Sequence, residues 1–141
     1  MKAQSAVFEQ VLLFTISVAI FIIALGIFQF YQSYFSSASL SDHTRAVRDI
    51  VYNHIAELTQ IEDLNASFML KIPKQLAGEY YTLKINNTEF SVVTQQTGIA
   101  AVSNISSLSL GYGGMYTFSG ETRSSRGKII IYKRGHNIIL G

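Results

Sequence analysis

The chain has 141 residues, of which 48% are hydrophobic, and its formal net charge is +2. This length allows one small domain and a separate N-terminal segment, and it is too short for two globular domains. The basic residues are scattered along the chain and form no block, which argues against nucleic acid as a partner. The sequence contains no cysteine, which excludes disulfides, thiolate metal sites and a thiol nucleophile.

A long apolar segment dominates the N-terminal quarter of the sequence. From Val11 to Phe28 the run is interrupted only by two hydroxyl residues and one glycine. In helical form, and with the three residues that follow it, this run crosses the roughly 30 Å hydrocarbon core of a bilayer. The aromatic and amide residues after the run are typical of a membrane interface and not of a signal-peptide cleavage site. We therefore expect residues 4–35 to form a hydrophobic transmembrane or filament-core helix.

The charges before this run and the sequons after it predict an orientation. Lys2 and the terminal amine precede the apolar run, and positive charge tends to stay on the cytoplasmic side of a membrane. Three N-x-Ser/Thr sequons follow the run and make Asn65, Asn86 and Asn104 candidate N-glycosylation sites. The same asparagines are also ordinary polar turn residues, so the sequons alone do not decide whether they carry sugar. We expect a cytoplasmic N-terminus and an extracellular C-terminal domain.

Residues 36–61 show the pattern of an amphipathic helix. Ser41 and Asp42 have the side chains that cap a helix start. Beyond them, mainly apolar residues recur at three- and four-residue steps, namely Val47, Ile50, Val51, His54, Ile55, Leu58 and Ile61. No proline or glycine separates this segment from the apolar run. The two segments therefore also fit one long helix of about fifty residues, either straight or bent at the intervening serines.

From residue 62 onward the period changes from helical to alternating. Turn residues separate seven predicted strands: Phe68–Ile72, Tyr80–Asn86, Glu89–Thr94, Ile99–Ser103, Met115–Ser119, Lys128–Tyr132 and Asn137–Leu140. Short strands joined by tight turns predict a small antiparallel β-domain over residues 62–141, with the apolar stripe of the amphipathic helix covering one face. The fold class is therefore α+β. The last strand completes this sheet, or, as an apolar edge strand, pairs with a neighbouring molecule.

The sequence offers no constellation of residues for catalysis, for a metal or for another cofactor. The histidines, His43, His54 and His136, have neither helical metal-ligand spacing nor clustered carboxylates beside them. We interpret His54, on the apolar stripe, as a packed histidine. Gly111–Gly114 lacks the strand and helix that flank a phosphate loop, and we interpret it as a flexible loop. We expect no enzyme activity, and a function exerted through surfaces and the membrane segment.

The first residues of the chain resemble the archaeal type IV pilin-like proteins that carry a class III signal peptide. The resemblance lies in Lys2 and Ala3 followed by Gln4, then Glu9, then the uncharged apolar run. In that family a prepilin peptidase removes a short basic leader before the apolar segment. The resemblance implies a leader of residues 1–3 and a cut between Ala3 and Gln4. A cut one residue later would place Glu9 at the fifth mature position, where the family usually has its acidic residue.

The resemblance also implies a role for Glu9. In the family this glutamate neutralises the terminal amine of a neighbouring subunit within a filament. A lone carboxylate in hydrocarbon is costly, and a partner charge offsets that cost. In the alternative interpretation, Glu9 marks the cytoplasmic edge of an ordinary membrane helix and lies among the headgroups.

Two functions follow from these patterns. The first is a structural subunit, a pilin or minor pilin, of an archaeal type IV pilus-like surface filament that supports adhesion. Its partners are copies of itself or other pilins, the membrane and a prepilin peptidase-like enzyme. The alternative is a permanently membrane-anchored extracellular β-domain protein that binds the cell envelope or other filament subunits, similar to the accessory proteins of the archaellum. Leader cleavage distinguishes the two functions.

Overall fold

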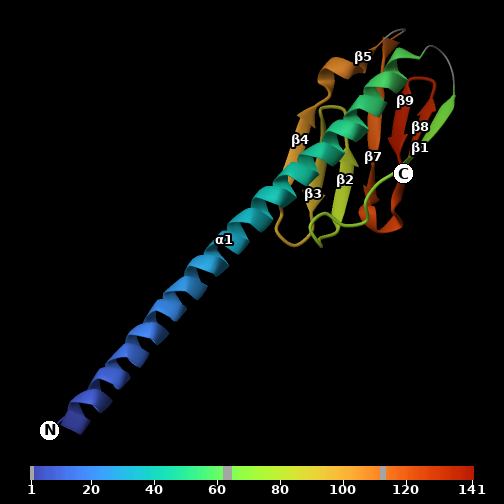
Figure 1. Ribbon diagram of the computed structural model, residues 1–141. Helices are drawn as coiled ribbons and strands as arrows, with labels where there is room; N and C mark the ends of the chain where they lie inside the picture. Colours follow the sequence, from blue (N-terminus) through green and yellow to red (C-terminus); the bar gives the residue numbers. More distant parts are fainter. Residues whose placement is uncertain (1, 62–64, 112–113) are drawn as a thin grey trace. The chain divides into compact units, whose positions relative to one another are not determined.

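The computed structural model describes residues 2–61, 65–111 and 114–141, with the side chains of residues 6–61, 65–110 and 115–141. This part of the chain forms one α-helix, nine strands and two short 3-10 helices (Figure 1). They are α1 (Lys2–Gln60), β1 (Ala66–Lys71), β2 (Tyr81–Ile85), β3 (Glu89–Thr94), β4 (Ala100–Asn104), η1 (Ser106–Ser109), β5 (Leu110–Gly111), β6 (Gly114–Met115), β7 (Thr117–Arg123), η2 (Ser124–Arg126), β8 (Lys128–Arg134) and β9 (Asn137–Leu140). The chain divides into two compact units, residues 1–37 and 38–141, which are taken in turn.

The first unit consists of the apolar half of α1. Every described side chain from Ala6 to Ser37 is exposed, and the large ones include Phe8, which is 72% exposed. The hydroxyl groups of Thr15 and Ser17 each donate to the carbonyl four residues earlier, at 2.8 Å, so both are satisfied inside the helix. By length and composition, α1 is able to cross a membrane.

The second unit is built on a seven-stranded sheet with the order β1-β8-β9-β7-β2-β3-β4. All neighbouring strands in it are antiparallel except β7 and β9, which are parallel. The fold is thus α+β with a mostly antiparallel sheet, as the sequence predicts, and β7 with β9 is its one parallel pair among the described strands. The reason is that β9 inserts between β7 and β8. A tight hairpin makes β9 antiparallel to β8, and since β7 and β8 run in opposite directions on either side of it, β9 runs parallel to β7.

The position of β9 depends on a glycine in the neighbouring strand. Gly120 of β7 has a φ of 131°, and a Cβ atom there would lie 2.2 Å from the carbonyl oxygen of Leu140. Only glycine allows the two backbones to approach this closely. The predicted strand Asn137–Leu140 therefore completes its own sheet in the interior, and the alternative of an edge strand that pairs with another molecule is wrong.

The last part of α1 covers one face of this sheet (Figure 1). Six residues at three- and four-residue steps are buried on its inner side: Leu40, Thr44, Val47, Val51, Ile55 and Leu58. The largest fully buried apolar side chains of the sheet are Tyr81, Leu83, Phe90, Val92, Ile129, Ile131 and Ile138, and they form one core with the apolar residues of the helix. The buried stripe of α1 and the inward-facing side chains of the strands thus form a single hydrophobic layer.

Tyr81 fixes a loop to the edge of this core. Its side chain is fully buried, and its hydroxyl group donates to the carbonyl of Pro73 at 2.6 Å. Burial raises the pKa of the Tyr81 hydroxyl above its ordinary value. The backbone N–H of Tyr81 donates to Ser124 Oγ, which in turn donates to the carbonyl of Lys74. The loop before β2 is therefore held to the sheet by buried hydrogen bonds.

Some predicted boundaries agree with the structure and others do not. The strands Glu89–Thr94 and Asn137–Leu140 have the predicted limits.

Ser41 and Asp42 lie inside α1, so the predicted helix start is wrong. The alternative of one long helix is confirmed by a helix of 59 residues. The predicted strand Met115–Ser119 is divided, because Met115 belongs to the β5–β6 hairpin and β7 begins two residues later. Within the loop predicted at 111–114, residues 112 and 113 lie outside the described residues.

Two isoleucines of α1 test the packing of the helix on the sheet. Ile55 is fully buried, whereas Ile50, which the sequence also placed on the apolar stripe, is 51% exposed. We expect Ile55→Ala to lower the free energy of unfolding of the domain by about 2–5 kcal/mol. Ile50→Ala, the same chemical change on the same helix, should stay within about 0.5 kcal/mol.

The measurement is denaturant unfolding of the detergent-solubilised full chain, followed by near-UV circular dichroism of its tyrosines. Equal effects of Ile50→Ala and Ile55→Ala would contradict the orientation of α1 on the sheet.

Candidate interaction surfaces

The described histidines lie apart from one another along the fold. Among the described residues, no group of three or more histidine, aspartate or glutamate side chains is placed to hold a metal ion. Each histidine has a local contact instead. His43 Nδ1 lies 2.7 Å from the carbonyl oxygen of Ser39. The ring of His54 lies 5.0 Å from that of Phe68, and the ring of His136 lies near a tyrosine. His54 is therefore packed, as the sequence predicts.

The exposed apolar side chains of α1 form the first candidate surface, which we call the apolar helix surface. Its large members lie between Val7 and Phe35 and are between 40% and 72% exposed. Glu9 lies on this half of α1 and is exposed. The backbones of Lys2, Ala3 and Gln4 belong to α1, but their side chains lie outside the described residues, so the predicted leader site stays a prediction.

A second candidate surface lies on the sheet face that α1 does not cover. Four side chains point outward from neighbouring strands there: Met69, Ile130, Tyr132 and Ile139, which we call the outer apolar patch. Met69 pairs with Ile130 and Tyr132 with Ile139 in the strand register. Met69 is 59% exposed and Ile139 is 37% exposed, so water contacts an apolar strip across three strands.

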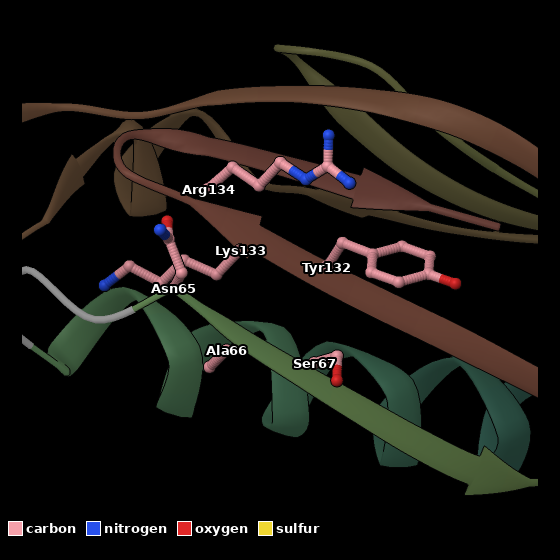
Figure 2. Close-up of a pocket in the computed structure, with 6 residues that line it drawn as sticks. All are labelled: Asn65, Ala66, Ser67, Tyr132, Lys133 and Arg134. Carbon is pink, nitrogen blue, oxygen red and sulfur yellow. The ribbon is translucent and has the colours of Figure 1, made fainter.

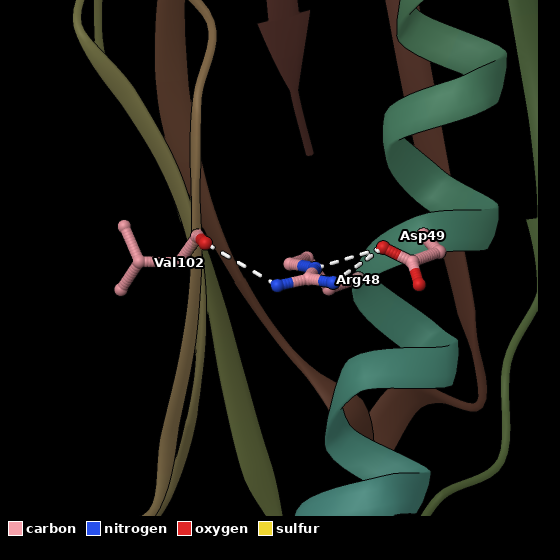
Figure 3. A network of polar contacts seen from close by, with 3 residues as sticks. All are labelled: Arg48, Asp49 and Val102. Atoms are coloured by element: carbon pink, nitrogen blue, oxygen red, sulfur yellow. Dashed lines mark hydrogen bonds and ion pairs between the residues drawn. The ribbon is translucent and has the colours of Figure 1, made fainter.

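The two edges of the sheet differ in how they are protected. At the β4 edge, Arg48 of α1 donates through Nη1 to the carbonyl of Val102 at 3.4 Å, and Nη2 pairs with Asp49 at 2.7 Å (Figure 3). A charged group from the helix thus covers part of this edge strand. At the other edge, β1 exposes Phe68 and Met69. Charge at a sheet edge opposes pairing with a further strand, and apolar side chains do not.

The most deeply buried charged side chain of the described chain is Lys133 on β8. It is only 1% exposed, and Figure 2 shows it reaching toward the end of α1. Nζ donates to the carbonyl of Leu58 at 3.1 Å, to the carbonyl of Ile61 and to the hydroxyl group of Tyr116 at 3.0 Å. The last carbonyls of a helix have no partner within it and carry its negative dipole end. Lys133 therefore caps the C-terminus of α1.

Sequence reasoning missed this cap, although a signal for it was present. The predicted strand ended at Tyr132, but the alternation of Ile129 and Ile131 continues onto Lys133, which places its side chain on the covered face. Lysine rarely lies in a core, so composition alone argues against an inward lysine at this position.

A cavity of about 340 Å³ lies beside this cap and is lined by Asn65, Ala66, Ser67, Tyr132, Lys133 and Arg134 (Figure 2). It is formed where β1 begins and β8 ends. Its described lining holds an amide, hydroxyl groups and two basic side chains. Asn65 Oδ1 accepts a hydrogen bond from the backbone N–H of Gly135 at 3.1 Å. The described lining of the cavity thus offers polar contacts.

The three sequon asparagines are all exposed in the second unit. Asn65 precedes β1, Asn86 follows β2, and Asn104 ends β4. The structure brings the second and third sequons into direct contact, because the backbone N–H of Ile105 donates to the carbonyl of Thr88 at 3.0 Å.

Comparisons of the chain with protein-family models, with curated proteins and with solved structures each found no match. The assignment of function therefore depends on the surfaces described above and on the resemblance of the N-terminal residues.

Replacing the capping lysine tests its role. Lys133→Met keeps the length of the side chain but removes the donor from two helix carbonyls and the Tyr116 hydroxyl group. We expect the free energy of unfolding to fall by about 1–3 kcal/mol, the cost of buried acceptors without a partner. Lys84→Met is the matched control, because the Lys84 side chain is 55% exposed and pairs with Glu121 at the surface. The control should change stability by at most about 1 kcal/mol.

Unfolding of both lysine variants is measured by denaturant titration. A Lys133→Met protein as stable as the Lys84→Met protein would show that the cap contributes little.

Proposed function

We propose that this protein is a structural subunit of an archaeal type IV pilus-like surface filament, in which α1 residues 4–35 pack against the same segment of neighbouring subunits. One observation carries the proposal: a single helix is apolar and exposed around its whole circumference in its first half and covers a β-sheet in its second half. The N-terminal resemblance to pilin-like proteins supports the same conclusion.

The apolar helix surface needs an apolar environment. A soluble helix buries one stripe, whereas a helix that is apolar on all sides lies in a bilayer or among other helices. The described side chains of residues 6–37 have no cover within their own unit. In the proposed life cycle, the bilayer covers this surface before assembly and copies of α1 cover it afterwards.

Glu9 supports assembly in preference to simple anchoring. Glu9 lies at the edge of the apolar run, where a bilayer leaves its carboxylate near the headgroups, but packed apolar helices in a filament would surround it, and a carboxylate in such surroundings calls for a compensating charge. In the filament we assign that charge to the terminal amine of a neighbouring subunit. The peptidase cut, between Ala3 and Gln4 or one residue later, generates this amine.

In this proposal the β-domain has a defined location and a contact surface. The N-terminus is cytoplasmic before assembly, the domain of residues 62–141 is extracellular, and the outer apolar patch supplies contacts between neighbouring domains. The patch is suited to this because it is apolar and exposed, and aromatic and methionine side chains are enriched at protein interfaces. The proposed partners are copies of this chain or other pilins, and no step in the proposal needs a cofactor or metal.

One observation favours the alternative, a permanently anchored extracellular domain that binds the cell envelope or other filament subunits. Phe30, Tyr31, Tyr34 and Phe35 form a cluster of exposed aromatic rings, in which the rings of Tyr31 and Phe35 stack with centroids 6.3 Å apart. Aromatic belts of this kind lie at membrane interfaces. A lasting anchor would keep this belt at the interface, and a subunit would leave it on assembly.

The N-terminal sequence and intact mass of the protein from the membranes of its source organism separate the two functions. We expect a chain that begins at Gln4 or Ser5. The free amine must lie near Glu9 for charge pairing, and only the processed chain presents it there. A chain that begins at Met1 or Lys2 would overturn the filament proposal and favour the anchor.

Removing the charge of Glu9 tests its role in assembly. With Glu9→Gln, the amine of the neighbouring subunit loses its counter-charge in an apolar environment. We expect the amount of subunit in sheared filaments to fall about tenfold, which corresponds to about 1.4 kcal/mol per contact, while the amount in membranes is unchanged. Glu57→Gln, on the exposed face of the same helix, is the control and should leave assembly unchanged. Equal assembly of the two variants would make Glu9 an interfacial residue.

A further inference from the structure

The sequons at Asn86 and Asn104 share one local geometry. Asn86 Oδ1 accepts hydrogen bonds from the backbone N–H and the hydroxyl group of Thr88, at 2.9 and 2.8 Å. Asn104 Oδ1 accepts the same two bonds from the N–H, at 2.8 Å, and the hydroxyl group of Ser106. Each asparagine thus binds the hydroxyl residue of its own sequon. The amide is held through its oxygen, and its nitrogen takes no part in the turn.

This geometry arises from residues only two positions apart. Side chains of asparagine form such turns with nearby backbone groups without help from the rest of the fold. The turn is therefore present in the folded domain, which is the form that the modification is inferred to act on. Both asparagines are also exposed in the folded domain.

Asn65 differs from the other two asparagines. Its Oδ1 accepts a hydrogen bond from the backbone N–H of Gly135, which lies 70 positions along the chain. The hydroxyl residue of its sequon, Ser67, lies inside β1 and pairs with Tyr132 of β8. This sequon is therefore part of the sheet and lacks the local turn.

The two turns lie side by side at one end of the domain. The backbone N–H of Ile105 donates to the carbonyl of Thr88, and Glu89 pairs with Asn104 across β3 and β4. The carbonyl oxygen of the Asn87 side chain ties the same turn to β7 by accepting from the backbone N–H of Phe118 at 2.7 Å. Each turn is thereby fixed to the sheet while its modifiable nitrogen stays outside the turn.

We propose that Asn86 and Asn104 carry neighbouring N-linked oligosaccharides and that Asn65 carries none. The donor is a lipid-phosphate-linked oligosaccharide used by a membrane-bound oligosaccharyltransferase. The asparagine Nδ2 forms a bond to the anomeric carbon as the bond from that carbon to the phosphate oxygen breaks. The lipid phosphate leaves, and the proton of Nδ2 passes to a base of the transferase. The inference rests on the extracellular location in the proposed function, but not on filament assembly.

Mass spectrometry of the protein from its source organism tests the inference. Glu89 lies between the two sequons, so cleavage after glutamate places Asn86 and Asn104 on different peptides. Fragmentation that keeps glycans attached then assigns each one. We expect glycan on both of these peptides and none on the peptide that holds Asn65. Absence of glycan from either Asn86 or Asn104, or a glycan on Asn65, would overturn the assignment.

Matched variants separate modification from folding. Asn86→Asp and Asn104→Asp keep the acceptor oxygen of the turn and remove only the nitrogen, so each should lower the intact mass by one glycan. Asn65→Asp should leave the glycan mass unchanged. Thr88→Ala should abolish modification of Asn86, and Thr88→Ser, which keeps the hydroxyl group, should preserve it. Modification of Asn86 in the Thr88→Ala protein would contradict a role for the turn.

The result of the glycan analysis does not depend on whether the leader is removed. A protein that begins at Gln4 or Ser5 and carries no glycan on Asn86 or Asn104 would overturn this inference and leave the filament proposal standing. A protein with both glycans and an intact Met1 would do the reverse.

Discussion

One buried ammonium group holds the end of the long helix to the sheet. Lys133 Nζ donates to the carbonyls of Leu58 and Ile61 and to the hydroxyl group of Tyr116, and it lies 5.0 Å from the centroid of the Tyr116 ring. A buried ammonium group without partners would be strongly unfavourable, so the site is stable only when helix, strand and tyrosine are in place together. The cap therefore fixes where α1 stops along the sheet, and with it the register in which Val51 and Ile55 enter the core.

The helix then has two roles along one continuous element. Its last turns bury a narrow stripe against the sheet, and the remaining charged and polar residues face water, as in an ordinary α+β domain. Its first half exposes apolar side chains on every side, which no water-soluble monomer tolerates over such a length. The protein therefore combines a domain that is stable in water with a segment that needs lipid or protein around it. This combination explains why surfaces, and not a reactive centre, carry the proposed function.

Sequence patterns predicted the elements that depend on local periodicity. The limits of β3 and β9 and the cover of one sheet face by the amphipathic helix follow from short-range alternation and helical spacing. The prediction of a helix start at Ser41 and Asp42 was wrong, because capping side chains mark a helix start only when the preceding residues are not already helical. The exposure of Ile50 depends on which side of α1 faces the sheet, and that side is set by partners far along the chain.

The features that sequence could not predict are non-local. The insertion of β9 between β7 and β8 depends on the close approach of Gly120 to Leu140. The cap by Lys133 joins residues more than seventy positions apart. For the candidate surfaces, the composition of the apolar helix surface could be read directly, since an all-apolar helix needs no tertiary information. The outer apolar patch could not be predicted from the sequence, because its members come from three strands and the sequence does not give the order of the strands.

The insertion of β9 into the middle of the sheet has a consequence for the order of events during synthesis. The chain order puts α1 before the strands, so its apolar half, which is long enough to cross a membrane, is made before the sheet. The two halves of the sheet, β1 with β8 and β7 with β2, are joined only through β9, whose residues come after all the others in the sheet. The complete sheet therefore cannot close before residues 137–140 are available. If the domain is extracellular, as proposed, such a chain would cross the bilayer as an extended polypeptide and close its sheet on the far side.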